Sequence, residues 1–236
     1  MLLLFDIDGT LLLRASAEHA AALREALGAV YGITASGPVV AAGRTDTAIA
    51  RDLAAAEGID GARFEADLGR FAAETFAGFE RRCPPDLSAA VAPGMPELLG
   101  RLASRADVRC SLVTGNYEPV ARLKLARAGI GHHFPAGQGG FGSDAEYRDE
   151  LPPIARARAG GYPRERTIVI GDTPLDIACA RADGLRVLAV ATGPYAAAAL
   201  TGADAVAADG WELAALLEDA LGAGAPARIS GPGACR

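Results

Sequence analysis

Short runs of apolar residues recur along the chain, and several of them end at a small or acidic residue. Their length and composition predict buried strands at residues 2–5, 108–113, 167–170, 186–190 and 203–206. Between them the pattern predicts helices at residues 95–105, 119–128, 151–159, 174–182 and 211–221. Strands that alternate with helices are typical of parallel βαβ units. The pattern therefore predicts an α/β protein with a doubly wound, Rossmann-like parallel sheet.

One interval departs from this alternation. About a hundred residues separate the first two predicted strands, although a simple crossover needs only a dozen or more. Most of this interval resembles several amphipathic or alanine-rich helices, so we expect a helical subdomain inserted after the first strand. The expected division is a core of residues 1–13 and 92–225, a helical cap of residues 14–91 and a flexible tail of residues 226–236.

Composition and charge exclude several function classes. The 236 residues include 23 Lys and Arg against 29 Asp and Glu, a net charge of −6 without a basic run, so we expect no nucleic-acid partner. Two acids interrupt the apolar N-terminus early, so we expect neither a signal peptide nor a membrane partner. The four cysteines form no C-x-x-C pair, which favours free thiols and a cytoplasmic location. A monomer is the default expectation, with a dimer left open.

The first candidate site lies directly after the first strand, in LFDIDGTLLL at residues 3–12. Side chains two residues apart in a strand point the same way, so Asp6 and Asp8 can face one site at the ligand-binding edge of the sheet. Two carboxylates this close raise one another's pKa unless a cation lies with them. Oxygen ligands favour Mg²⁺, which is often shared with a substrate phosphate. A solvated strand end without a function is the alternative.

Two later strand ends also carry polar residues. In SLVTGN, at residues 111–116, Thr114, Gly115 and Asn116 lie between a strand and a helix, where a hydroxyl and backbone amides suit a phosphate. In IVIGDTPLD, at residues 168–176, Asp172 directly follows a strand and Asp176 lies one helical turn beyond it. Both of these carboxylates can therefore face the same cation.

Together, DIDGT at residues 6–10, VTGN at 113–116 and GDTPLD at 171–176 resemble the haloacid dehalogenase (HAD) superfamily, in its phosphatase branch. The three motifs occur in the family's order, each after a strand. The helical insertion stands where the family carries a C1 cap, as in phosphoglycolate phosphatase-like and β-phosphoglucomutase-like members. The resemblance covers the whole chain.

The resemblance implies a role for each matching residue. Asp6 would be the nucleophile that forms an aspartyl-phosphate, and Asp8 would be the general acid and base. Mg²⁺ would be held by the carboxylates of Asp6 and Asp172 and by the backbone carbonyl of Asp8. Asp176 would mainly contact the groups around the metal rather than the metal itself. Thr114 would bind the transferring phosphoryl group, helped by the backbone amides of the VTGN turn.

The family's phosphoryl-binding lysine has no direct counterpart. Many relatives place it shortly before the last motif, but residues 131–166 contain no lysine, and Lys124 is the only one in the chain. Lys124 follows Thr114 in the next helix, and helical side chains lean back toward the N-terminus, so its long stem could reach the phosphate. We expect Lys124 to bind the phosphoryl group, with Arg148 as the main rival. A surface lysine left by chance is the alternative.

Two further segments are candidates for the site. Arg44, Thr45 and Asp46 form a polar turn before a cap helix and resemble the place where C1 caps contact the substrate, although Thr45 or Asp46 could equally cap that helix. Residues 139–142, GGFG, lack the strand-then-helix context of a dinucleotide site. We expect them to form an active-site loop.

These expectations favour a Mg²⁺-dependent phosphomonoester hydrolase that acts on a small phosphorylated metabolite. Dehalogenases and phosphonatases of the superfamily lack the second aspartate of the first motif, so Asp8 argues against both. A β-phosphoglucomutase-like phosphomutase would use the same two aspartates and stays open. The remaining alternative is a non-catalytic protein that binds a phosphorylated ligand in the same cradle. The sequence does not identify the substrate.

Overall fold

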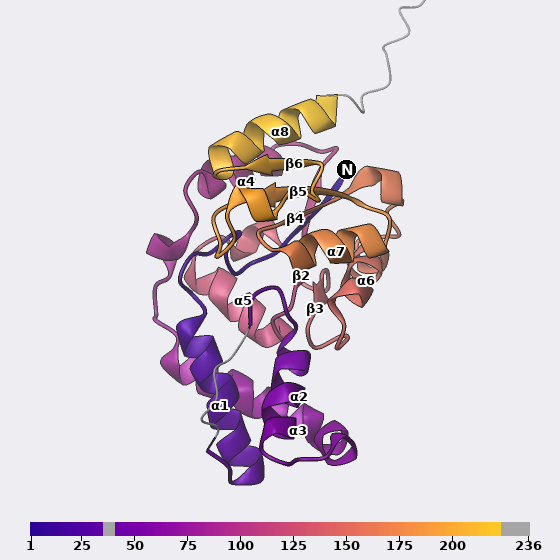
Figure 1. Ribbon diagram of the computed structural model, residues 1–236. Coiled ribbons are helices and arrows are strands. Elements are labelled where there is room, and N and C mark those ends of the chain that lie inside the picture. Colours follow the sequence, from indigo (N-terminus) through magenta and orange to yellow (C-terminus); the bar gives the residue numbers. More distant parts are fainter. Residues whose placement is uncertain (35–40, 223–236) are drawn as a thin grey trace, which may run out of the picture.

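A six-stranded parallel sheet forms the centre of the core (Figure 1). The computed structural model describes residues 1–34 and 41–222. The strands lie in the order β3-β2-β1-β4-β5-β6, and every neighbouring pair is parallel. Their bounds are β1 (Leu2–Phe5), β2 (Arg109–Thr114), β3 (Gly140–Phe141), β4 (Thr167–Gly171), β5 (Arg186–Val190) and β6 (Ala205–Ala207).

Helices cover both faces of this sheet. Leu3 and Phe5 of β1 pack into the cluster on one face, and Leu2 and Leu4 pack into the cluster on the other. All four are fully buried, as expected for a central parallel strand. The first face carries α4 (Met95–Ala103), α5 (Glu118–Arg127) and α8 (Gly210–Gly222), and the second carries α6 (Leu151–Arg158) and α7 (Pro174–Ala182). Short 3₁₀ turns lie at Ser88–Ala90, Gly131–His133, Arg148–Glu150, Arg164–Arg166 and Ala197–Ala199.

The expected helical insertion is confirmed between β1 and β2. It contains α1 (Ala17–Tyr31), α2 (Asp46–Ala56) and α3 (Gly61–Arg82), which Figure 1 shows gathered beside the core. Small side chains of α1, such as Ala22, face Gly78 of α3, where an added Cβ would lie 3.5 Å from the Ala22 Cβ. This close approach lets α1 and α3 pack along one another and bury the aromatic side chains of α3.

The predicted fold class and the predicted strands and helices are found, with shifts of at most two residues at their ends. Strand β3 is a correction, because residues 139–142 were expected to form only a loop. A two-residue strand that begins at a glycine is too short to show an alternating pattern. The tail at residues 226–236, and the last three residues expected for the core, lie outside the described residues.

Two connections join the insertion to the core, and they run side by side. The Leu13 backbone N–H donates to the Ala90 carbonyl at 2.7 Å, and the Ala92 N–H donates to the Leu11 carbonyl at 2.9 Å. We propose this pair of hydrogen-bonded connections as the boundary between a core and a cap, after residue 13 and before residue 92.

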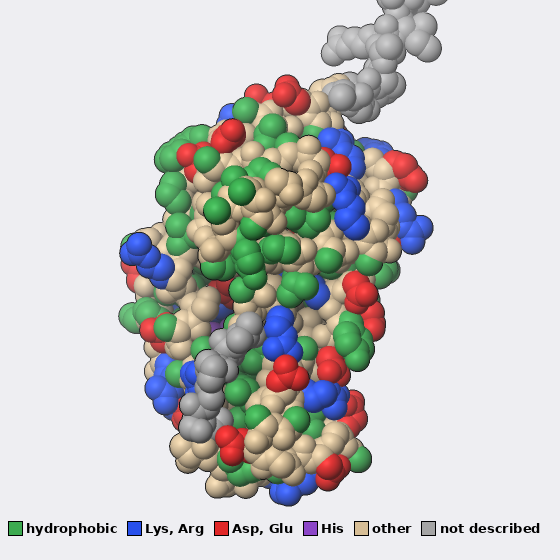
Figure 2. All heavy atoms as spheres, viewed as in Figure 1, with side chains coloured by type: hydrophobic (Ala, Val, Ile, Leu, Met, Phe, Trp, Pro, Cys, Tyr) green, Lys and Arg blue, Asp and Glu red, His purple; other side chains and the backbone are tan. Residues whose placement is uncertain are grey.

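The surface carries both signs of charge. In the view of Figure 2, Lys and Arg side chains are interspersed with Asp and Glu over the core and the inserted helices. Within residues 1–34 and 41–222, no helix is both long enough and apolar enough to cross a membrane.

Gly94, at the return to the core, should be intolerant of any side chain. Its φ is +80°, and an added Cβ would lie 2.6 Å from the Trp211 backbone nitrogen. Gly94→Ala should therefore lower the free energy of unfolding by roughly 1–3 kcal/mol in urea denaturation. Gly100, inside α4, is the matched control, because no atom lies within 4 Å of its added Cβ. Gly100→Ala should raise the free energy of unfolding by about 0.5–1 kcal/mol. Equal effects of the two substitutions would contradict this account.

Candidate active site

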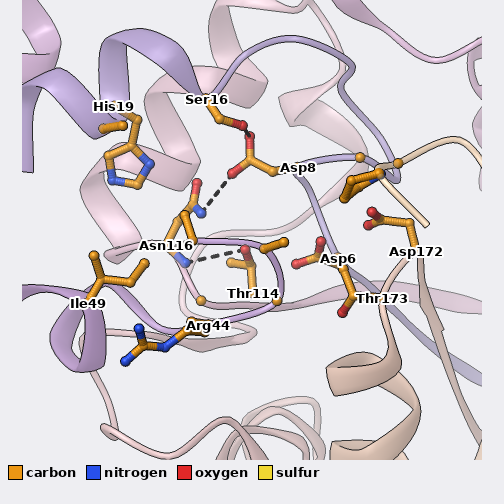
Figure 3. Close-up of a pocket in the computed structure, with 18 of the residues that line it drawn as sticks. Asp6, Asp8, Ser16, His19, Arg44, Ile49, Thr114, Asn116, Asp172 and Thr173 are labelled. Carbon is orange, nitrogen blue, oxygen red and sulfur yellow. Dashed lines mark hydrogen bonds between the residues drawn. The ribbon is translucent and has the colours of Figure 1, made fainter. Parts of the chain in front are cut away.

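A cavity of about 680 Å³ lies between the carboxyl edge of the sheet and the inserted helices. Core residues from three strand ends line one side, and residues of the insertion line the other. Figure 3 shows both groups around the same space. The core contributes Asp6, Asp8, Thr114, Asn116 and Asp172, and the insertion contributes Ser16, His19, Arg44 and Ile49.

The strand register explains why distant motifs meet here. Phe5, the last residue of β1, pairs with Leu112 of β2 and Ile170 of β4. Since all three strands are parallel, the residues that follow these pairs emerge at the same edge of the sheet. The structure therefore brings the three predicted motifs together.

A buried cluster of carboxylates dominates this edge. One carboxylate oxygen from each of Asp6, Asp172 and Asp176 lies within 4.8 Å of the others. Burial raises the pKa of Asp6 to about 7, and the charges of Asp176 and Asp8 add to this while Arg148 opposes it. Burial also raises the pKa of Asp172 to about 8, with further contributions from Asp6 and Asp176. The cluster repels itself and therefore favours a bound cation.

The ligand atoms fit a hard divalent cation. Asp172 Oδ1 accepts a hydrogen bond of 2.9 Å from Thr10 Oγ1, whereas the buried Oδ2 has no partner among the described residues. Asp176 Oδ1 is bound by Arg148, and its Oδ2 accepts from the Thr173 N–H at 2.9 Å and from Thr173 Oγ1 at 2.7 Å. The three carboxylates together could hold a metal ion, and Asp176 also binds Arg148 and Thr173.

The two candidate cations contact different aspartates. Arg148 Nη2 donates to Asp6 Oδ1 at 2.8 Å and also to Asp176, and its Nη1 donates to the Gly43 carbonyl of the insertion at 3.0 Å. Lys124 Nζ lies 2.8 Å and 2.6 Å from the two carboxylate oxygens of Asp8. Arg148 thus lies beside the expected nucleophile, and Lys124 lies beside the expected acid–base.

Asp8 is directed away from Asp6, toward Ser16 and Asn116 (Figure 3). Asn116 Nδ2 donates to Asp8 Oδ2 at 2.9 Å, and Ser16 Oγ donates to Asp8 Oδ1 at 3.2 Å. Burial alone would raise the pKa of Asp8, but Lys124, followed by His19, overcomes this and holds the pKa below its ordinary value. The two aspartates of the first motif therefore have opposite pKa shifts.

Comparisons with known proteins agree with these motifs. Residues 3–181, about three quarters of the chain, match the family described as haloacid dehalogenase-like hydrolase. The chain belongs to this family. Residues 151–213 also match a second family, described as HAD-hydrolase-like.

Individual relatives of this HAD-like hydrolase are more distant. A phosphoglycolate phosphatase from Rhodospirillum rubrum is 31% identical over 109 residues, which are 46% of this chain and 45% of that protein. The match thus spans less than half the length of that relative. β-Phosphoglucomutase from Clostridium difficile superposes with a TM-score of 0.67 at 17% identity, covering 94% of this chain and 97% of the other. CbbY from Rhodobacter sphaeroides, in complex with phosphate, superposes with a TM-score of 0.64 at 20% identity, covering 90% of this chain and 95% of the other. These two structures show the fold alone.

The polar turn of the insertion binds the core of the HAD-like hydrolase directly. Thr45 Oγ1 accepts from the Ala48 N–H at 3.2 Å and caps α2, which is the alternative expected for this residue. The Asp46 N–H donates to the Gly115 carbonyl at 2.7 Å. An added Cβ at Gly115 would overlap the Arg44 carbonyl, so only glycine permits this approach. Arg44 lines the cavity, and its Nη2 pairs with Asp52 at 2.6 Å.

Several residues of the site were missed by sequence reasoning. His19 and Ser16 stand on or just before α1 without a motif, and nothing in their spacing indicates a role. Gly193 packs so tightly on Asp172 that a Cβ would overlap its carboxylate. Thr173 forms a T-x-x-D capping box with Asp176, and this pattern was readable in the sequence.

The carboxylate cluster predicts a pH-dependent stability of the metal-free protein. The pKa values of Asp6 and Asp172 are raised by folding, so the folded chain binds more protons than the unfolded chain between the ordinary value of 3.8 and about 8. Stability should therefore be fully present below 3.8 and should fall as pH rises through about 7 to 8. The melting temperature should drop by roughly 2–4 °C for each kcal/mol lost.

Asp172→Asn and Mg²⁺ serve as the controls for this measurement. The substitution should flatten the decline, because it removes one of the repelling charges. Mg²⁺ should raise the melting temperature of the wild type more at about pH 8 than at about pH 5. An unchanged slope in Asp172→Asn would show that the cluster does not cause the decline.

Proposed function

We propose that this protein is a Mg²⁺-dependent phosphomonoester hydrolase that acts on a small phosphorylated metabolite through an aspartyl-phosphate on Asp6. The observation that carries the proposal is that two aspartates with different cationic partners lie at one cavity. Asp6 lies in the buried carboxylate cluster beside Arg148, whereas Asp8 lies two residues away and is bound by Lys124. Two carboxylates at one cavity, each with its own cationic partner, can take the separate roles of nucleophile and acid–base.

Each aspartate has one task in each half of the reaction. An Asp6 carboxylate oxygen attacks phosphorus, the bond from phosphorus to the leaving oxygen breaks, and Asp8 gives that oxygen its proton. In the second half Asp8 takes a proton from water, which attacks the phosphorus of the aspartyl-phosphate and releases inorganic phosphate with Asp6 restored.

Mg²⁺ would be held by the carboxylates of Asp6 and Asp172 and by the backbone carbonyl of Asp8. The orphaned, buried Asp172 Oδ2 supports this assignment. When bound, the ion supplies positive charge that offsets the repulsion between Asp6 and the phosphate. Thr114 and the backbone amides of Gly115 and Asn116 would orient the phosphoryl group from the other side of the cavity.

Arg148, rather than Lys124, is the cation that we assign to the phosphoryl group, which revises the expectation from the sequence. Arg148 Nη2 lies 2.8 Å from Asp6 Oδ1, and Arg148 lines the cavity. The planar guanidinium suits a phosphate, and it can bridge the nucleophile and the substrate.

The substrate class rests on smaller clues. The partial match to a phosphoglycolate phosphatase favours a monoester of a small metabolite, and the cap residues Arg44, Thr45 and Asp46 stay candidates for substrate selection. A phosphomutase shares the first half-reaction, so the assay must distinguish release of inorganic phosphate from transfer to a second hydroxyl. Both products should be measured on a panel of phosphorylated metabolites with Mg²⁺, and release of phosphate should predominate.

Turnover should depend on Asp6 and on the metal. Asp6→Asn should abolish phosphate release while leaving the melting temperature of the protein close to that of the wild type or higher, because an amide is a poor nucleophile and carries no charge. Asp8→Asn should retain the fold and slow release by about 10²–10⁴-fold, because the proton donor is lost. Wild-type activity in excess EDTA, or turnover by Asp6→Asn, would contradict the proposed function.

The choice between the two cations can be tested separately. Arg148→Met should reduce kcat by about 10²–10³-fold and weaken competitive inhibition by inorganic phosphate, because a donor to the phosphoryl group is removed. Arg148→Lys should recover part of the loss. Arg101→Met is the matched control, since Arg101 is exposed and pairs with Glu218 on the surface. If inhibition by phosphate is unchanged in Arg148→Met, Arg148 is not the residue that binds the phosphoryl group.

A further inference from the structure

Lys124 is fully buried on α5 and has no donor left for a phosphate. Its Nζ lies 2.8 Å and 2.6 Å from the oxygens of Asp8, 2.8 Å from Asn116 Oδ1 and 3.3 Å from His19 Nδ1. The ring of Phe79 lies 5.8 Å from the same atom. An ammonium has three N–H donors, and four polar atoms already surround this one. Lys124 is therefore committed to Asp8 and its neighbours.

His19 extends these contacts into the insertion. An ammonium only donates, so His19 Nδ1 must be the acceptor toward Lys124, and the ring proton then lies on Nε2. That nitrogen is 3.0 Å from Asp46 Oδ2, at ion-pair distance although not aligned for a straight hydrogen bond. His19 and Asp46 are both buried, and they belong to α1 and α2.

Asp46 returns the chain of contacts to the core. Its Oδ2 accepts from the Tyr117 N–H at 2.6 Å, at the start of α5, and its own N–H donates to the Gly115 carbonyl. Asp8, Lys124, His19 and Asp46 thus form one continuous set of polar contacts, which we call the Asp8 network. Half of its members come from the core and half from the insertion.

We infer that Lys124 and His19 are positioning residues for Asp8, and that the Asp8 network fixes the acid–base only while α1 and α2 lie against the core. The inference rests on the proposed function, in which Asp8 donates and accepts the proton. It explains why a buried lysine stands eight residues after Asn116 without reaching Asp6. It also assigns to the insertion a role besides covering the cavity.

The test compares leaving groups, because a general acid matters most when the leaving oxygen is basic. In Lys124→Met, kcat/KM for an alkyl phosphomonoester should fall by about 10²-fold, while kcat/KM for p-nitrophenyl phosphate should fall by less than about threefold. His19→Ala should show the same selective loss to a smaller degree. His19→Asn should recover part of it, because the amide can still accept from Lys124. His133→Ala, outside the site, is the matched control and should be unchanged.

A double-mutant cycle shows whether Lys124 acts through Asp8. In an Asp8→Asn background, Lys124→Met should have little further effect on kcat/KM, and inhibition by inorganic phosphate should be the same with and without Lys124. An equal loss for both leaving groups, an equal loss in both backgrounds, or weaker phosphate inhibition in Lys124→Met would overturn the inference. The His19 variants give the same comparison if Lys124→Met does not fold.

A crystal structure of Lys124→Met supplies a readout that does not depend on turnover. The Asp8 carboxylate should leave its place beside Asn116 and Ser16 when the ammonium is removed. If it keeps that place, the inference fails even where the wild type is active. If the wild type hydrolyses no phosphomonoester, the proposed function fails, and the position of Asp8 in this variant still decides whether Lys124 orients it.

Discussion

The burial of several like charges at one edge of a sheet is the constraint on which the rest of the structure depends. Asp6, Asp172 and Asp176 are nearly or fully buried, and the charge of Asp176 disfavours ionisation of both Asp6 and Asp172. Arg148 offsets part of this charge, and a metal would offset more. The tight packing of Gly9 and Gly193 on Asp172 keeps the cluster compact.

Each of the two aspartates that we propose as catalytic is bound by a different cationic side chain. Arg148 joins Asp6 to the cluster, where burial still dominates and the pKa stays raised. Lys124 contacts both oxygens of Asp8, where the ammonium prevails and the pKa is lowered. Asp6 and Asp8 are two positions apart in the sequence, but their pKa values shift in opposite directions because their cationic partners come from different elements.

The insertion contacts both Arg148 and Lys124. The Gly43 carbonyl accepts from Arg148, and His19 lies against Lys124, so each cation contacts the insertion as well as its aspartate. The Arg44 carbonyl of the insertion lies so close to Gly115 of the core that an added Cβ at Gly115 would overlap it. In our proposal, docking of the insertion and orientation of the charged groups are therefore coupled.

The sequence by itself determined the features that depend on local spacing. The pairing of Asp6 with Asp8, the strand ends at Thr114 and Asp172 and the helical insertion all follow from periodicity and from motifs within a few residues. Only the tertiary structure decided which cation meets which carboxylate, because Arg148 and Asp6 are 142 positions apart and Lys124 and Asp8 are 116 apart. Such contacts depend on how whole elements pack. Lys124 therefore lies on the expected helix but contacts Asp8 instead of the expected phosphoryl site beside Asp6.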